Sequence, residues 1–176
     1  FVTHGTLMKH WNTMSRGCLY FFENYLNALD APGEWFLDRD GWVYYKPRIG
    51  EDMTEAEVIA PRLERLLTIK GDTNDPAKRV KHLRFDGLKF RHGAFRIPPE
   101  GLPAMQGGMI TDVTAVMLDG AEDIRFDHCA IENIGGNAIW FREACRDCLV
   151  DRTRVFDLGV TGVRIGINRD VPEPNR

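Results

Sequence analysis

The sequence contains a short apolar pattern that recurs three times. The segments VKHLRFDGLKFRHG, EDIRFDHCAIENIGG and RDCLVDRTRVFDLGV share one spacing: apolar, any, apolar, two others, apolar, any, apolar. The second segment is separated from the third by 24 residues, and from the first by 41 residues, which is one repeat plus an insertion. Aligned on this spacing, the segments give four columns: Leu83, Ile124 and Cys148; Phe85, Phe126 and Val150; Leu88, Cys129 and Thr153; Phe90, Ile131 and Val155.

This pattern predicts a β-solenoid. In each segment apolar and other residues alternate every two positions on either side of a polar break, which is typical of two strands joined by a turn. The apolar residues of a helix would instead recur about every 3.6 positions. A strand-like unit of about 20 to 25 residues is the mark of stacked coils. Each coil turns its apolar side chains inward and the next coil covers them. We therefore expect an all-β fold, a parallel β-helix.

Composition suits one domain with a real core. The chain has 176 residues, of which 43% are hydrophobic, and a net charge of -3. That charge predicts neither nucleic acid nor an anionic membrane surface as a partner. No apolar run approaches transmembrane length, and no signal-peptide pattern opens the chain. Because the last repeat is followed by no obvious cap, we expect an internal piece of a longer protein.

Residues 1–50 precede the repeats and are expected to pack on the solenoid. A helix is predicted within residues 1–32, where Ser15 could cap it. Its apolar residues recur every three or four positions: Leu19, Phe22, Leu26 and Leu29. The segment EWFLDRDGWVYYKP predicts a hairpin with a two-residue turn at Asp40 and Gly41. Its aromatic residues are interpreted as hairpin packing, with a sugar-stacking surface as the alternative: Trp35, Phe36, Trp42, Tyr44 and Tyr45.

Residues 51–176 are predicted to form the solenoid. The run EVIAPRLERLLTIKG fits two short strands of an early coil, interrupted by Pro61. The insertion at 96–112 carries three prolines and three glycines and cannot form a regular coil. It would either form one wall of a binding cleft or be a loose excursion.

Several segments together resemble the right-handed β-helix proteins around glycoside hydrolase family 141. They are FFENYLNALDAPGEWFLDRDGWVYYKP, EDMTEAEVIAP, LRFDGLKFRHG, IENIGGNAIWF and DLGVTGVRIG. The resemblance implies a right-handed, pectate-lyase-like β-helix that continues beyond Arg176. It also implies a secreted or periplasmic bacterial enzyme acting on plant-type polysaccharide, with fucosidase and xylanase activities in the family. No cofactor is expected.

A first polar column contains His92, Asn133 and Asp157. The glycines that follow it are expected to leave the backbone open to a ligand: Gly93, Gly135, Gly136 and Gly159. Asp157 is the first candidate for a catalytic carboxylate. By resemblance, DLGVTGVRIG falls where the family has a catalytic Asp, while Asn133 stands where many members have His, which weakens a proton-transfer role for this column. The alternative is a ladder of polar side chains that only hydrogen-bond along the stack.

The partner of Asp157 is expected on the next coil, beyond Arg176, and Glu132 is the candidate within the chain. Stacked strands lie about 4.8 Å apart. Retaining glycosidases hold their carboxyl groups about 5 to 5.5 Å apart, and inverting ones about 6.5 to 9.5 Å. Carboxylates one coil apart therefore suit retention, and a diagonal or skipped-coil pair suits inversion.

A second polar column contains Asp86, Asp127 and Asp151. Stacked carboxylates either extend into water, share protons through raised pKa values, or bind a cation such as calcium. Solvated turns are the preferred interpretation, with basic neighbours at Arg84, Arg125 and Arg152. No metal site is expected at Cys145-x-x-Cys148, because no second cysteine pair has suitable spacing. Cys148 and Cys129 are instead expected to lie in the core.

Trp140 and Arg164 complete the candidate site. Trp140 is expected to point outward, where a pyranose ring could stack on it, and Arg164 to bind a sugar hydroxyl or a uronate carboxylate. Surface packing is the alternative for both. The leading hypothesis is a glycoside hydrolase acting through Asp157. The alternatives are a calcium-dependent polysaccharide lyase, with Arg91 or His92 as base, and a non-catalytic glycan-binding module.

Overall fold

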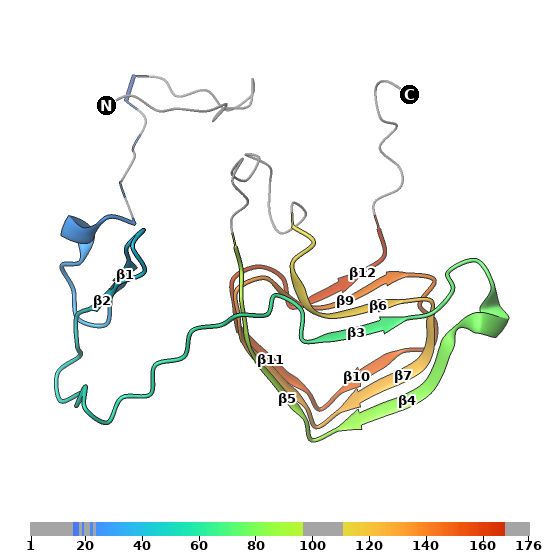
Figure 1. Cartoon of the computed structure of the whole chain (residues 1–176). Coiled ribbons are helices and arrows are strands. Elements are labelled where there is room, and N and C mark those ends of the chain that lie inside the picture. Colours follow the sequence, from blue (N-terminus) through green and yellow to red (C-terminus); the bar gives the residue numbers. More distant parts are fainter. Residues whose placement is uncertain (1–15, 18, 20–21, 23, 97–110, 168–176) are drawn as a thin grey trace. The chain divides into compact units, whose positions relative to one another are not determined.

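The computed structural model describes residues 16–17, 19, 22, 24–96 and 111–167. Contacts within the chain divide it into two units, residues 1–59 and 60–176. Figure 1 shows the elements of both, and each unit is described by itself.

The first unit contains the predicted hairpin. Strand β1 (Trp35–Leu37) pairs antiparallel with β2 (Val43–Tyr45). The turn is longer than predicted: the Asp38 amide donates to the Trp42 carbonyl at 2.8 Å, and the Gly41 amide to the Asp38 carbonyl at 3.0 Å. Gly41 has a φ of 87°. This is a three-residue loop closed by a left-handed glycine, the next commonest hairpin after the two-residue turn.

The helix predicted within residues 1–32 is not found in the part of that segment which the structure describes. Only a 3₁₀ turn, η1 (Leu26–Ala28), forms there, and Asn24 has a φ of 66°. Leu19 is fully exposed, and Phe22 is 55% exposed. A short helix depends on burial of its apolar face, and these side chains have no such burial. The remaining predicted helix residues lie outside the described part.

The second unit is built from strands that return to the same three sheets. The first coil has β3 (Leu67–Lys70), a 3₁₀ turn η2 (Pro76–Lys78), β4 (Val80–Asp86) and β5 (Lys89–Gly93). The second has β6 (Thr114–Asp119), β7 (Ala121–Asp127) and β8 (Ala130–Ile134). The third has β9 (Asn137–Glu143), β10 (Leu149–Asp151) and β11 (Arg154–Leu158), and β12 (Val163–Ile165) follows it.

All pairings between coils are parallel. The sheets have the orders β12-β9-β6-β3, β10-β7-β4 and β11-β8-β5. This all-β arrangement is consistent with a β-helix or another solenoid, as the repeat predicted (Figure 1). The early coil has one strand, β3, where two were predicted. Val58 lies outside any strand and is 74% exposed, so local β-propensity alone did not form a strand there.

The strand register confirms the apolar columns. Phe126 pairs with Phe85 in β4 and with Val150 in β10, and Ile131 pairs with Phe90 and Val155. The rings of Phe85 and Phe126 are stacked, with centroids 4.9 Å apart and planes 12° apart. Like residues therefore lie on like residues in successive coils, which is how a solenoid builds its core.

Each coil bends at residues in the left-handed region, and these also form columns. Their φ values lie between 44° and 68°. Few non-glycine residues adopt this conformation, Asn, Asp and His most readily. Three such columns run through the three coils: His82, Asp123 and Asp147; Gly87, His128 and Arg152; His92, Asn133 and Asp157. The first polar column of the sequence is thus a bend of the backbone.

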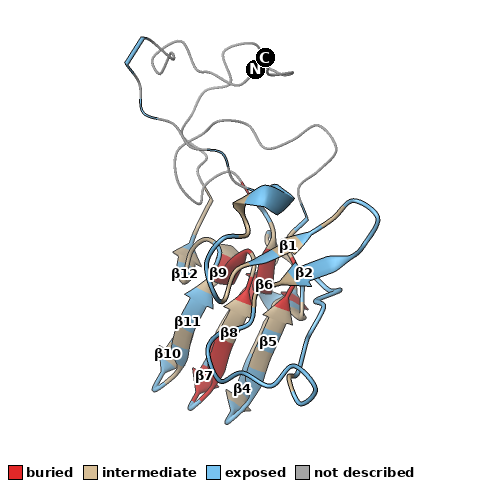
Figure 2. Ribbon diagram, turned by 90° about the vertical axis from the view of Figure 1, so that its left-hand side faces the viewer, coloured by how far each residue is buried: buried red, intermediate tan, exposed pale blue. Residues whose placement is uncertain are grey.

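The core is centred on the middle coil. Every residue of β6 is buried, as are Ile124, Phe126 and Ile131 at 0% exposure. In the flanking coils, strands with a neighbour on one side only, such as β4 and β11, are partly buried or exposed (Figure 2). Strand β9 lies between β6 and β12 and is mostly buried. Among the described residues, no helix has the length and apolar character needed to cross a membrane.

Candidate functional site

The column of His92, Asn133 and Asp157 lies at the ends of β5, β8 and β11. The side-chain amide of Asn133 donates to Oδ2 of Asp157 at 2.5 Å. Asp157 is exposed, whereas His92 and Asn133 are half-buried. The hydrogen bond fixes the Asp157 carboxylate at the surface, where a ligand could reach its other oxygen.

Glu132 lies on the outer face of β8, diagonally beside Asp157. Its strand partner in β11 is Phe156, the residue before Asp157. In ideal parallel strands this diagonal places the two Cα atoms about 6 Å apart. The Glu132 side chain is 13% exposed and pairs with Nε of Arg91 at 2.7 Å. Sequence reasoning missed this ion pair, although the repeat alignment already placed Arg91 and Glu132 at equivalent positions.

Trp140 lies on β9 between two residues of the core cluster, Ile139 and Phe141, and its own side chain is covered. The residue is 3% exposed, and the Arg164 guanidinium lies 3.7 Å from the centre of its ring. The indole nitrogen donates to the Gly166 carbonyl at 2.8 Å, and Arg164 donates to the Thr111 carbonyl at 3.2 Å. A sugar could stack on this face of Trp140 only after Arg164 moved, so a sugar-binding role for the pair stays a prediction.

The glycines beside the first column do not keep the backbone open to a ligand, contrary to expectation. A Cβ at Gly159 would lie 2.1 Å from the Gly135 carbonyl oxygen, and one at Gly136 would lie 2.5 Å from that of Val113. A Cβ at Gly135 would approach Phe95 to 2.7 Å. Close packing between neighbouring backbone segments therefore requires these glycines.

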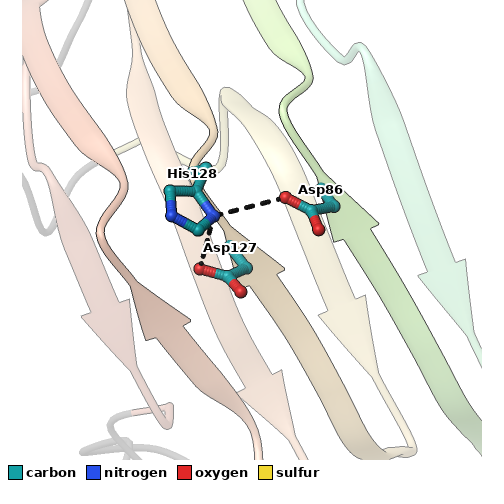
Figure 3. A group of neighbouring side chains, drawn as sticks. All are labelled: Asp86, Asp127 and His128. Carbon is teal, nitrogen blue, oxygen red and sulfur yellow. Dashed lines mark ion pairs between the residues drawn. The ribbon is translucent and has the colours of Figure 1, made fainter.

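In the second polar column Asp86 and Asp151 are exposed, as solvated turns would be, whereas the middle carboxylate is buried. Asp127 is 7% exposed, and its carboxylate is held by Arg84 at 2.7 Å and by Arg152 at 3.0 Å. Figure 3 shows His128 between two carboxylates, with its Nδ1 atom 3.1 Å from Asp127 and 3.4 Å from Asp86. The three groups lie within 4.8 Å of one another, a spacing that a metal ion could span. Two guanidinium groups already balance the Asp127 charge, however, which disfavours a cation here.

Arg125 does not join the second column, contrary to expectation. Its Nε atom donates to Oδ1 of Asp123 at 3.0 Å, and Nδ1 of His82 lies 2.9 Å from the other oxygen. The hydrogen bond from His82, followed by that from Arg125, lowers the pKa of Asp123. Sequence reasoning missed this cluster because it depends on the left-handed bend at His82 and Asp123.

The cysteine pair belongs to the packing of the core. Cys145 and Cys148 are half-buried and lie against the core cluster, and Cys129 is 3% exposed. Burial raises the pKa of Cys145 to about 11 and also raises the pKa of Cys148. Both thiols therefore stay protonated near neutral pH, whereas metal binding and nucleophilic attack require a thiolate.

Comparison with known proteins finds one similar fold. No protein family and no curated protein matches the chain. A solved structure named "Glycoside hydrolase" is similar, with a TM-score of 0.64 and 27% sequence identity. The match covers 78% of this chain and 28% of that structure. The chain thus has a glycoside hydrolase-like fold and spans less than a third of the length of that protein.

Proposed function

We propose that this chain is part of a right-handed parallel β-helix glycoside hydrolase of the family 141 type, which cleaves plant-type polysaccharide. The observation that carries the proposal is the placement of Asp157. Its carboxylate is exposed, held by Asn133, and flanked by Glu132 on the neighbouring coil. The similarity to a glycoside hydrolase supports the same reaction class. Because the match covers 28% of that structure, the activity is proposed for the whole protein.

In this mechanism two carboxyl groups cleave the glycosidic bond, and Asp157 is one of them. Asp157 either attacks the anomeric carbon as nucleophile or, as general base, takes a proton from the water that attacks it, and a second carboxyl group protonates the leaving oxygen. Glu132 is the candidate for that group within the chain, and a carboxylate on a later coil is the alternative. Asn133 orients Asp157, and Arg91 holds Glu132.

The other proposed contacts orient the sugar. His92 continues the column of Asn133 and Asp157 by one coil. Trp140 and Arg164 lie on a different sheet, where Arg164 covers the ring. They would contact sugar only if that cover opened. A secreted or periplasmic location follows from the same proposal, because polysaccharide substrates lie outside the cell.

A calcium-dependent lyase is less well supported. That mechanism needs a cation beside the substrate carboxylate, and the Asp86, Asp127 and Asp151 column was its candidate ligand set. Arg84 and Arg152 contact Asp127 instead. The pairing of Arg91 with Glu132 also occupies one of the two candidate bases.

The test uses the whole protein with Asp157→Asn and Glu132→Gln, assayed on a panel of plant and algal polysaccharides. Asp147→Asn is a matched control, because Asp147 is exposed and has a φ of 53°, against 54° for Asp157. New reducing ends and the ultraviolet absorbance of unsaturated products are followed with and without a chelator. We expect reducing ends without absorbance, unaffected by chelator, and reduced at least about 100-fold by Asp157→Asn. Full activity in Asp157→Asn, or absorbance lost with chelator, would overturn the hydrolase mechanism.

A further inference from the structure

The outer face of the β11-β8-β5 sheet carries two rows of side chains beside the candidate site. Outward positions alternate with inward ones along each strand. Equivalent positions lie next to one another in successive coils. The first row is Lys89, Ala130 and Arg154, and the second is Arg91, Glu132 and Phe156.

The first row contains two cations that have no acidic partner among the described residues. Arg91, in the second row, is paired with Glu132 at 2.7 Å. Lys89 and Arg154 are exposed, and neither makes an ion pair within the part of the chain that the structure describes. The contact of Arg154 is with the ring of Phe156, whose centre lies 4.8 Å from the guanidinium carbon. Their charges are therefore available to a ligand.

Ala130, which is 9% exposed, lies between the two cations and contributes only a methyl group there. It pairs with Lys89 on one side and with Arg154 on the other. Two strand spacings place the backbones of Lys89 and Arg154 about 10 Å apart. Both side chains are long enough to converge over the Ala130 methyl group, but like charges there would repel. An anionic group between them would relieve that repulsion and could take a two-pronged hydrogen bond from the guanidinium.

The position of this row suits a bound oligosaccharide. Ala130 lies three residues before Asn133, or about 10 Å along the strand. At that distance the Asp157 charge is largely screened, because the Debye length in physiological salt is about 8 Å. Phe156 is 41% exposed and lies beside Glu132, so the part of its ring that the Arg154 guanidinium does not cover offers an apolar surface to a sugar.

We propose that Lys89 and Arg154 form a subsite for the anionic group of an acidic sugar, a carboxylate or a sulfate ester. This subsite lies near the sugar that is cleaved. The inference rests on the proposed function and deepens it by naming the substrate class: an acidic polysaccharide rather than a neutral one. Nothing in the overall charge of -3 indicates this local basic row.

The test measures binding of the whole protein by affinity electrophoresis in gels that contain one polysaccharide each. The probes are polygalacturonate, a sulfated galactan and a neutral galactan. Lys89→Gln with Arg154→Gln is compared with wild type, and Lys70→Gln is the control. Lys70 is an exposed residue of a different sheet and makes no ion pair among the described residues.

We expect the double variant to bind at least one acidic polysaccharide about 10- to 100-fold more weakly, while Lys70→Gln binds as wild type does. Loss on polygalacturonate alone identifies a carboxylate, and loss on the sulfated galactan alone identifies a sulfate. Unchanged binding to both, an equal loss in Lys70→Gln, or an equal loss on the neutral galactan would overturn the subsite.

Hydrolysis by the same variants separates the two proposals. If Asp157→Asn abolishes cleavage and the double variant binds and cleaves normally, the subsite is wrong and the hydrolase stands. If the double variant loses binding but Asp157→Asn cleaves as wild type does, the subsite stands and the role of Asp157 is wrong.

Discussion

Replacing Gly159 by alanine should separate two neighbouring coils. The new Cβ would lie 2.1 Å from the Gly135 carbonyl oxygen, where real contacts are rarely below 3.0 Å. Both atoms belong to backbone, so no side chain can rotate to relieve the contact. The strand must move by about 1 Å, which strains the hydrogen bond from the Gly159 amide to the Ile134 carbonyl, now 2.7 Å. Overpacking costs about 1 to 3 kcal/mol and a lost hydrogen bond about 1 kcal/mol.

Gly162→Ala is the matched control. A Cβ there meets Val155 at 3.6 Å and Leu158 at 3.8 Å, which are ordinary contacts. Replacing that glycine should stabilise the fold by about 0.4 to 1 kcal/mol, because it restricts the unfolded chain. Gly159→Ala should lower the free energy of unfolding by about 2 to 4 kcal/mol, a large share of the 5 to 15 kcal/mol typical of a domain.

The free energy of unfolding of both variants is measured by urea unfolding followed by far-ultraviolet circular dichroism. The dependence of that free energy on urea concentration should be the same as in wild type, which shows that the same transition is compared. The packing argument is refuted if Gly159→Ala unfolds within about 0.5 kcal/mol of wild type. It is refuted equally if Gly162→Ala is destabilised by the same amount.

Three further predictions follow from burial and charge. Phe126 is 0% exposed, and Phe126→Ala should lower the free energy of unfolding by about 3 to 5 kcal/mol. Leu149 is 45% exposed, and Leu149→Ala should lower it by less than about 1 kcal/mol. Equal losses for the two variants in urea unfolding would contradict the core position of Phe126. The pKa of Asp123 is lowered mainly by its hydrogen bond with His82. Its stabilising contribution is therefore present above the unfolded pKa near 3.9 and disappears as pH falls through the folded value. The Asp123→Asn variant should be less stable than wild type at pH 7 and as stable as wild type near pH 2. An equal difference in stability at the two pH values would speak against the pairing of Asp123 with His82. Burial raises the pKa of Cys145 to about 11. At pH 8 iodoacetamide should therefore modify this thiol at least about 100-fold more slowly than a free thiol with a pKa near 8.5. Mass spectrometry measures the rate, and a rate comparable to that of the free thiol would exclude burial of Cys145.

The apolar columns were predictable because they follow from a short rule. A strand alternates every two residues, and a coil repeats at a fixed length, so aligning the segments placed Phe85 with Phe126 and Phe90 with Ile131, as the register confirms. The same alignment placed Asn133 beside Asp157. What it did not give was the backbone conformation of that column, because a left-handed residue leaves no mark on hydrophobic periodicity.

The failed helix prediction has a different cause. Leu19, Phe22 and Leu26 have helical spacing, but periodicity shows only which residues could share a face. Whether a helix forms depends on a second surface to cover that face. In the described part of the segment, all three side chains are exposed and only a 3₁₀ turn forms.

Some features of the candidate site could likewise be predicted from the sequence, and others could not. Sequence alone determined the order of the columns, and with it the neighbours of Asp157 and the core position of Cys148. Only the tertiary structure decided that Arg164 covers Trp140, that Arg91 holds Glu132, and that Gly159 is needed for packing. The physical reason is that strand register depends on spacing along the chain, whereas side-chain cover and backbone approach depend on what the neighbouring coils bring within a few ångströms.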